Sequence, residues 1–129
     1  MSQGTISKQA TPQTLRDFTA TFNTRDLEAV MTYFTDDAVF DSPRGPDPWG
    51  RRFSGKDQVR EGLAARFAGL PQLHYGDDEH FVIGDRGFSS WTLTGTTNEG
   101  GHLEVRGCDL WTFREGLILK KDSFWKIRE

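Results

Sequence analysis

The segment Leu103–Ile127, which reads LEVRGCDLWTFREGLILKKDSFWKI, is the most informative part of this chain. Leu103, Val105, Trp111 and Phe113 follow a period of two in its first half, which is typical of a strand with one buried face. Glu115-Gly116 interrupts the pattern and predicts a turn. The segment therefore predicts a long strand, 103–113, followed by a last strand, 117–127.

Two more strands are expected before this segment. His80–Ile83 and Phe88–Thr97 have the same period of two, and the second is rich in Ser, Thr and Trp. The turns 84–87 and 98–101 contain glycine and connect these strands to their neighbours. The C-terminal part of the chain therefore reads as an antiparallel meander.

The N-terminal half has a helical period instead. Thr11-Pro12 predicts an N-cap and a proline in the first turn, so one helix runs to about Thr24. A second helix begins near Asp26, and a third follows Ser54, which predicts an N-cap with Asp57 near the capping-box position. The apolar stripes of the three helices are Leu15, Phe18 and Phe22; Leu27, Val30, Met31 and Phe34; and Val59, Leu63, Phe67 and Leu70.

Between the second and third helices the sequence predicts a short strand, 38–41, and then a loop, 42–52. Three prolines and two glycines within the loop segment favour this interpretation. Three helices followed by a meander indicate an α+β fold, in which long strands curl around the helices as a half-cone. The interior of such a cone is a pocket between a sheet face and helix faces.

Length and composition limit the function. The 129 residues suit one domain, 11–129, preceded by a polar, pattern-free arm, 1–10, that we expect to be mobile. A net charge of −3 disfavours a nucleic-acid partner, and no apolar run is long enough to span a membrane. Residues 1–10 lack the apolar core of a signal peptide, so a cytoplasmic location is expected. The single cysteine, Cys108, excludes an internal disulfide.

Four stretches of the chain resemble a known family. They are RDLEAV with FTDDAV (25–30 and 34–39), SGKDQVR (54–60), CDLWTFREGLI (108–118) and DSFW (122–125). In order and spacing they are similar to SnoaL-like, ketosteroid-isomerase-like members of the nuclear transport factor 2-like superfamily. The resemblance implies a conical α+β barrel with its pocket inside the cone, and a homodimer packed through the sheets. This scaffold hosts isomerases, cyclases, dehydratases and non-catalytic binders.

The resemblance also implies roles for particular positions. Ketosteroid isomerase uses an aspartate base, and a tyrosine and a protonated aspartic acid that donate to the enolate oxygen. The protonated acid matches Asp109, and a pocket tryptophan matches Trp125. The position of the base falls on Ser42, with Asp41 one residue earlier. The position of the tyrosine falls on Phe18. A serine hydroxyl is a poor proton acceptor and a phenylalanine cannot donate, so ketosteroid isomerisation itself is not expected.

Alternation along the strands predicts the pocket lining. Val105, Gly107 and Trp111 share the face of Asp109, and Lys121 and Ser123 join them from the last strand. We expect Ser90, Thr92 and Thr94 to line the pocket, with Trp91 and Leu93 on the outer face. The remaining ligand-binding candidates are the apolar wall of Phe18, Phe22, Met31 and Phe34, and Trp49, which either forms a lid with Arg51 and Arg52 or pins its loop to the body.

Asp109 is the leading catalytic candidate, and two interpretations of it remain open. It is either a general acid/base or hydrogen-bond donor for a ligand carbonyl, or a buried carboxylate paired with Lys121. In the second case it stays ionised and cannot act as a neutral donor, but the pair can still bind an anionic ligand or transfer a proton. Neither the three histidines nor Cys108 shows the spacing of a metal site, and no cofactor is expected.

Two functions therefore compete. The first is a cofactor-independent isomerase, cyclase or dehydratase acting on a small hydrophobic carbonyl compound, because each of these reactions stabilises an enolate-like oxygen in a dry pocket. The second is a non-catalytic module that binds a hydrophobic ligand or serves as a dimeric interaction domain. Variants of Asp109 discriminate between the two, because only the enzyme needs this side chain for turnover.

Overall fold

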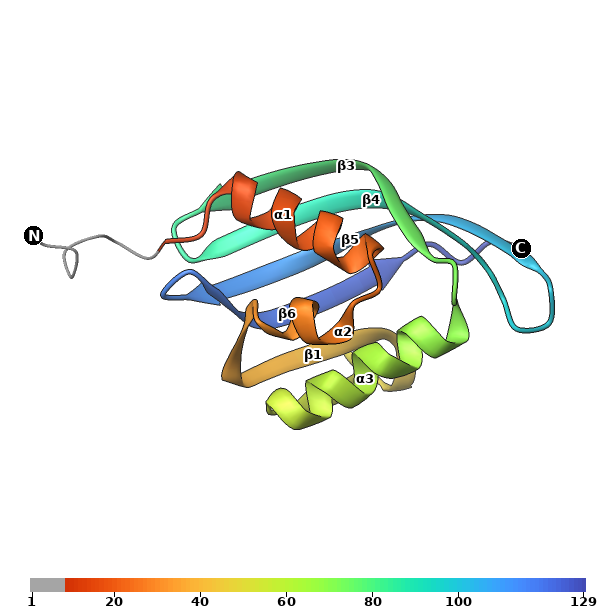
Figure 1. Cartoon of the computed structure of the whole chain (residues 1–129), viewed down its shortest axis with the longest axis horizontal. Helices are drawn as coiled ribbons and strands as arrows, with labels where there is room; N and C mark the ends of the chain where they lie inside the picture. Colours follow the sequence, from red (N-terminus) through yellow and green to blue (C-terminus); the bar gives the residue numbers. More distant parts are fainter. Residues whose placement is uncertain (1–8) are drawn as a thin grey trace, which may run out of the picture.

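A curved six-stranded sheet organises the computed structural model, which describes residues 9–129 (Figure 1). The strands are β1 (Phe34–Asp47), β2 (Gly50–Ser54), β3 (His74–Ile83), β4 (Arg86–Thr96), β5 (His102–Arg114) and β6 (Leu117–Trp125). Their order across the sheet is β2-β1-β6-β5-β4-β3. β1 and β6 pair in parallel, whereas the other neighbours are antiparallel.

Three helices lie on the concave side of this sheet (Figure 1). They are α1 (Pro12–Asn23), α2 (Leu27–Met31) and α3 (Lys56–Gly69). Their apolar faces and the inner face of the sheet form one core, which includes Leu15, Val30, Val59, Leu63 and Leu93, each at most 1% exposed. The predicted α+β cone, with three N-terminal helices packed in the concave face of a curved sheet, is confirmed.

The starts of the first two helices follow the expected capping. Thr11 and Thr14 bond reciprocally, with each side-chain oxygen accepting the other residue's backbone N–H, and Pro12 occupies the first helical position. Asp26 caps α2, because its Oδ1 accepts the N–H of Ala29 at 3.2 Å.

The cap predicted for the third helix is wrong by one residue. The N-cap is Gly55 at φ +87°, a backbone conformation that favours glycine, and it makes no side-chain cap. The backbone N–H of Ser54 donates instead to Gln58 Oε1 at 2.9 Å.

The predicted loop 42–52 is also wrong, because these residues form a hairpin. β1 extends to Asp47 and pairs with β2 through Asp41↔Arg52, Ser42↔Arg51 and Asp47↔Gly50. Pro43 and Pro46 lie in the irregular gap between Ser42 and Asp47, where the ladder does not need their missing N–H groups.

Two smaller expectations change as well. Phe34, assigned to the second helix, begins β1 instead, although it remains buried at 1% exposure. The predicted arm 1–10 lies outside the described residues except for Gln9 and Ala10, and Ala10 packs into the core with 4% of its surface exposed.

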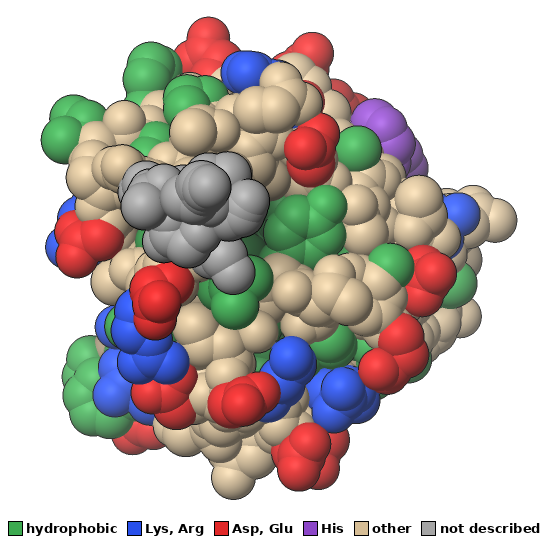
Figure 2. Space-filling view, turned by 60° about the vertical axis from the view of Figure 1, so that its left-hand side comes forward, with side chains coloured by type: hydrophobic (Ala, Val, Ile, Leu, Met, Phe, Trp, Pro, Cys, Tyr) green, Lys and Arg blue, Asp and Glu red, His purple; other side chains and the backbone are tan. Residues whose placement is uncertain are grey.

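The molecular surface mixes charges of both signs. Figure 2 shows acidic and basic side chains close together on the face that it presents. Some of them form ion pairs, such as Arg60 with Glu28 at 3.0 Å and with Asp57 at 3.2 Å. Within residues 9–129, the helices are too short and too polar for any of them to cross a bilayer.

Candidate functional site

A carboxylate and an ammonium are buried together between the sheet and the helices. Asp109 on β5 and Lys121 on β6 are 4% and 2% exposed, and Lys121 Nζ donates to Asp109 Oδ1 at 2.9 Å. Lys121 also donates to Ser123 Oγ at 2.7 Å, and the Ser123 hydroxyl donates to the same carboxylate. The pairing of Asp109 with Lys121 is therefore present, and the Asp109 carboxylate accepts from both Lys121 and Ser123.

Trp91 on β4 supplies the third donor to this carboxylate. Its Nε1 lies 2.9 Å from Asp109 Oδ2. The strand register explains the contact, because Trp91 stands opposite Gly107, which belongs to the same face as Asp109. A Cβ at Gly107 would lie 2.5 Å from atoms of the Trp91 ring, so this glycine makes the space for the indole.

The predicted pocket face of β4 is therefore wrong by one residue. Trp91 and Leu93, expected outside, are buried at 2% and 0% exposure, as is Ser89 at 1%. Ser90 and Thr92 alternate with them and lie on the outer face, together with Thr94. The signal that could have revealed the true face is Gly107, because a glycine in a strand often marks close approach by a bulky neighbour.

Aromatic rings enclose the ammonium of Lys121. Its Nζ lies 5.1 Å from the ring centroid of Phe40, 5.5 Å from that of Trp111 and 5.8 Å from that of Phe22. The negative faces of such rings attract a cation. The predicted lining did not include Phe40, although the short strand 38–41 that carries it was predicted.

The environment lowers the pKa of Lys121. Burial is the main cause, since the ammonium loses its hydration, and the charge of Arg66 adds to the effect. The carboxylate of Asp109 acts in the opposite direction and partly restores the pKa. The Lys121 ammonium therefore releases its proton more readily than an exposed lysine does.

The interior contains little free space. The cavity at the ion pair offers about 10 Å³ to the centre of a water molecule, which is close to the minimum for a single water. Its lining is mainly aromatic and comprises Phe18, Thr19, Phe22, Tyr75, Trp91, Asp109, Trp111 and Lys121. Four of the predicted ligand-binding residues line this cavity: Phe18, Phe22, Trp111 and Lys121. The side chains of the protein itself, however, fill the interior of the cone.

Asp41 does not join Asp109. It belongs to the outer face of the sheet, where its carboxylate accepts from Arg52 at 2.8 and 2.9 Å and lies 3.5 Å from Lys120. Burial tends to raise the pKa of Asp41, but the hydrogen bonds and charges of Arg52 and Lys120 outweigh it and lower the pKa. Its assignment as a catalytic residue is therefore corrected to that of an outer-face ion pair.

The other predicted site residues are spread over the molecule. Ser42 and Trp125 line a surface cleft beside α3, and neither lines the cavity at Asp109. Trp49 is 46% exposed, stacks with Arg52 at 4.9 Å, and lines a groove with Asp122 and Phe124, so it does not cover the interior. Phe34 packs behind Phe18, with ring centroids 5.8 Å apart.

His80 takes part in a chain of hydrogen bonds that sequence analysis missed. Its Nε2 lies 2.7 Å from Asp78 Oδ2, and its Nδ1 lies 2.7 Å from Ser89 Oγ. Ser89 Oγ also accepts the Nε1–H of Trp111 at 2.8 Å, so the chain ends at a ring of the cavity wall. The imidazole is 1% exposed, so this chain of hydrogen bonds begins at a buried side chain.

A reactive cysteine and a metal site were the two further possibilities, and the structure supports neither of them within residues 9–129. Cys108 is half-buried on the opposite face from Asp109, and burial raises the pKa of its thiol, which disfavours the reactive thiolate. Across residues 9–129, no three His, Cys, Asp or Glu side chains gather in a way that could hold a metal ion.

Solved structures with the same fold come from several bacteria. A candidate polyketide cyclase from Pseudomonas putida is 16% identical, with 92% of each chain covered and a TM-score of 0.81. A candidate isomerase from Bacillus subtilis is 19% identical, covers 88% of this chain and 84% of its own, and has a TM-score of 0.75. A protein of ketosteroid isomerase-like fold from Catenulispora acidiphila, solved with trimethylamine, is 17% identical, covers 92% and 88%, and has a TM-score of 0.79.

At these identities the likeness shows the fold alone. No curated protein matches the chain by sequence. The model of the SnoaL-like domain family, however, matches residues 15–120, which include every strand and all three helices in whole or in part. The chain therefore belongs to the SnoaL-like domain family.

Proposed function

We propose that this chain is a cofactor-independent enzyme that transfers a proton on a small hydrophobic carbonyl compound, as an isomerase, cyclase or dehydratase does. The observation that carries the proposal is the ion pair of Asp109 and Lys121 within an aromatic interior. Burying two charges costs several kcal/mol per ion, and hydrophobic residues of similar volume stabilise a fold as well or better. Family membership and the similarity to candidate cyclases and isomerases support the same class.

In this proposal Asp109 accepts a proton from the carbon next to the substrate carbonyl. The electron pair of the broken C–H bond moves onto the oxygen and forms an enolate. Lys121 donates a hydrogen bond to that oxygen, and its lowered pKa makes it a stronger donor. In an isomerisation, Asp109 then returns the proton to another carbon. In a cyclisation, the enolate carbon attacks a second carbonyl, whose oxygen takes up the proton from Asp109.

This assignment differs from that of ketosteroid isomerase. The tyrosine position is Phe18, which lines the cavity but cannot donate, and Ser42 lies in a different part of the surface. Lys121 takes over the donor role, and the acid position becomes the base. A substrate also has to displace part of the aromatic wall, of which Phe18 and Phe22 on α1 form one side.

Hydrogen exchange tests this proposal without knowledge of the natural substrate. Enolisable probes such as 1-tetralone and cyclohex-2-enone are incubated with the protein in D2O, and deuterium uptake next to the carbonyl is followed by NMR. We expect wild-type protein to accelerate uptake and Asp109→Asn to lower the acceleration by about 100-fold or more. Asp41→Asn is the matched control, because it removes a carboxylate from a buried ion pair on the other face of the sheet.

Folding is checked in the same samples by circular dichroism, since Asp109→Asn leaves Lys121 without its counter-ion. Trp91→Phe serves as a milder variant that removes one donor to Asp109. Acceleration that is equal in wild type and a folded Asp109→Asn contradicts the proposal. So does the absence of acceleration by the wild type over the whole panel of probes.

The second candidate is a non-catalytic domain, and the closed interior favours it. With about 10 Å³ free at the ion pair, the aromatic side chains already pack as a core does. In that case the pair is a structural element, and replacing both partners by Asp109→Leu/Lys121→Met leaves every function of the domain in place.

We also propose that a second copy of the chain covers the outer face of the sheet. Apolar side chains run across four neighbouring strands there, with Phe81 beside Phe88, Phe88 beside Leu110, and Cys108 beside Phe124. Phe81, Phe88, Leu110 and Phe124 are 56%, 36%, 37% and 46% exposed. A row of this kind on a sheet is self-complementary across a twofold axis, which suits a homodimer.

A further inference from the structure

A cleft beside α3 contains three arginines. It lies between the β1–β2 hairpin, α3 and the end of β6, and it encloses about 380 Å³, which is within the range of small-molecule sites. The residues of its lining that matter here are Arg44, Arg51, Arg66, Trp125, Ala65 and Gly69. No acidic residue belongs to this lining.

The charge in the cleft is uncompensated. Within residues 9–129, no carboxylate lies within 4.0 Å of the guanidinium groups of Arg44, Arg51 and Arg66. Among the arginines of residues 9–129, only Arg52, Arg60 and Arg114 form ion pairs. The cleft arginines differ from the other unpaired ones because they gather around one concavity. In a protein of net charge −3, three unpaired cations around one concavity indicate an anionic ligand.

Arg66 is held in place for such a ligand. Its guanidinium lies 4.5 Å above the ring of Trp125, and its Nη1 donates to Tyr75 Oη at 3.2 Å. A guanidinium carries five N–H donors in a planar fork, so most of them remain free to bind a carboxylate. The Trp125 ring lies beside this guanidinium and offers a flat apolar surface to the cleft.

The cleft is connected to the buried ion pair. Tyr75, which accepts from Arg66, also lines the cavity at Asp109 and packs edge-to-face on Trp91 with ring centroids 4.7 Å apart. The charge of Arg66 is one of the causes that lower the pKa of Lys121, after burial. Arg66 therefore acts on both the cleft and the candidate catalytic pair.

We propose that this cleft binds the carboxylate of a planar organic acid, with Arg66, Arg51 and Arg44 around the anion and Trp125 against the flat ring system. The small residues Ala65 and Gly69 on α3 leave room for a flat molecule, whereas the Phe53 ring fills the space beside Gly62. One part of the inference rests on the proposed function: if the chain is that enzyme, its substrates are carbonyl compounds that also carry a carboxylate. The binding of the anion itself is independent of Asp109.

A matched pair of probes tests the cleft. Binding of 2-naphthoate and of its uncharged analogue 2-naphthamide is measured by calorimetry and by quenching of tryptophan fluorescence. We expect the carboxylate to bind at least 10-fold more tightly than the amide, and less tightly as salt is raised. Arg66→Gln and Arg51→Gln each weaken naphthoate binding by about 10-fold and leave amide binding unchanged.

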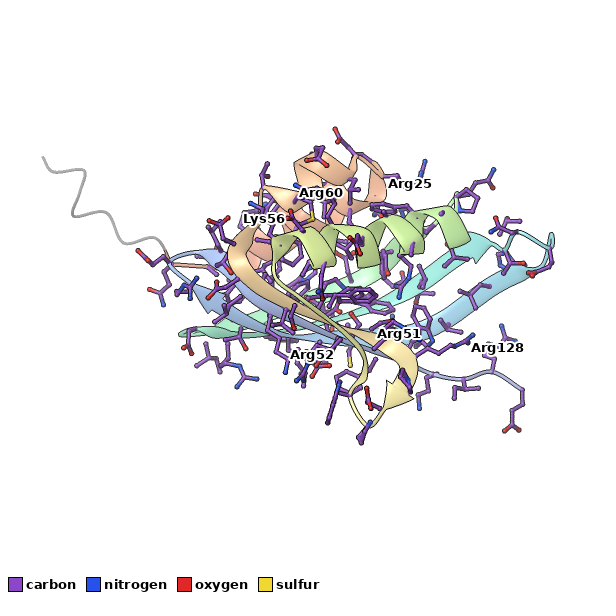
Figure 3. The ribbon with its side chains drawn as sticks, turned by 90° about the horizontal axis from the view of Figure 1, so that it is seen from below. Arg25, Arg51, Arg52, Lys56, Arg60 and Arg128 are labelled. Atoms are coloured by element: carbon purple, nitrogen blue, oxygen red, sulfur yellow. The ribbon has the colours of Figure 1, made fainter. Side chains whose placement is uncertain are left out.

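Arg60→Gln is the matched control for Arg66→Gln. It makes the same substitution on the same helix, but Arg60 belongs to a surface ion-pair cluster with Glu28 and Asp57 and does not line the cleft. Figure 3 labels Arg60 on α3 and Arg51 at the β1–β2 hairpin, well apart from each other. Circular dichroism of each variant verifies that it is folded.

Three outcomes overturn the inference. Equal binding of acid and amide excludes charge recognition, and naphthoate binding that is unaffected in both cleft variants places the anion elsewhere. Much tighter binding of 2-naphthyl phosphate than of naphthoate indicates a phosphate site instead. Naphthoate binding that persists in Asp109→Asn, without proton exchange in wild type, refutes the proposed function but leaves the anion site in place.

Discussion

The indole of Trp91 and the carboxylate of Asp109 are joined across β4 and β5 by a hydrogen bond of 2.9 Å. Lys121 contacts the other carboxylate oxygen from β6, also at 2.9 Å. Three strands therefore hold one carboxylate in a fixed orientation. Buried polar groups that are fully satisfied in this way make their surroundings rigid, and the loss of one partner is costly.

Lys121→Met tests the energetic coupling of the buried pair. The variant removes the counter-ion of the buried Asp109, so we expect the free energy of unfolding at pH 7 to fall by about 3–5 kcal/mol. The double variant Asp109→Leu/Lys121→Met is expected to recover most of that loss. Urea unfolding monitored by tryptophan fluorescence measures both values. A double variant that is less stable than Lys121→Met contradicts the description of the two groups as a desolvated pair.

Ser89→Ala and Ser90→Ala compare the two faces of β4. Ser89 Oγ serves both His80 and Trp111 inside the protein, so its removal leaves a buried ring nitrogen and the indole N–H without partners. We expect a loss of about 1–3 kcal/mol of unfolding free energy. Ser90 lies on the outer face, and its substitution is expected to change stability by less than about 0.5 kcal/mol. Thermal unfolding of the two variants side by side decides the matter, and equal effects would refute the assignment of the faces.

Gly107→Ala tests the close approach of Trp91. The new Cβ would lie 2.4 Å from the carbonyl oxygen of Phe124 and 2.5 Å from the Trp91 ring, so the backbone or the indole has to move. We expect a loss of about 1–3 kcal/mol and a change in the near-UV circular dichroism of tryptophan. Gly69→Ala is the control, because its Cβ meets nothing within 4 Å and alanine favours a helix by up to about 1 kcal/mol.

Acid titration tests the role of Asp41. The pKa of Asp41 in the folded protein is below its ordinary value of 3.8, so between these two values the unfolded chain binds more protons than the folded chain. The contribution of Asp41 to stability is therefore complete above pH 3.8 and is lost as the pH falls through the folded-state value. We expect Asp41→Asn to be less stable than wild type at neutral pH and the difference to shrink below pH 4. A difference that stays constant from pH 7 to pH 2 would exclude this ion pair as its source.

Leu110→Glu tests the proposed homodimer. A charge in the middle of the apolar row is expected to convert a dimer to a monomer, as measured by light scattering after gel filtration. Ile83→Glu is the control, because Ile83 is 84% exposed at the end of β3 next to the turn. If wild-type protein is a monomer at micromolar concentration, or if Leu110→Glu remains a dimer, the outer face is not the interface.

Most of the secondary structure could be predicted from local signals. The Thr11 cap, the end of the third helix near Gly69 and the turn at Glu115-Gly116 depend on residues that are close in sequence. The structure of segment 42–52 could not be predicted in this way, because its glycines and prolines taken alone favour a loop. It forms a hairpin arm because β1 finds partners on both sides, in β2 and in the distant β6.

The candidate site divides in the same way. The sequence alone determined that Asp109 and Trp111 lie on the same face of their strand. It also determined that Lys121 and Ser123 lie on the same face of theirs, because alternation within a strand is a local property. Only the tertiary structure decided that Trp91, and not Ser90, meets Asp109, and that Phe22 and Phe40 close around Lys121. The pairing of one strand with another depends on backbone hydrogen bonds between distant residues, and a shift of one residue moves every side chain to the opposite face.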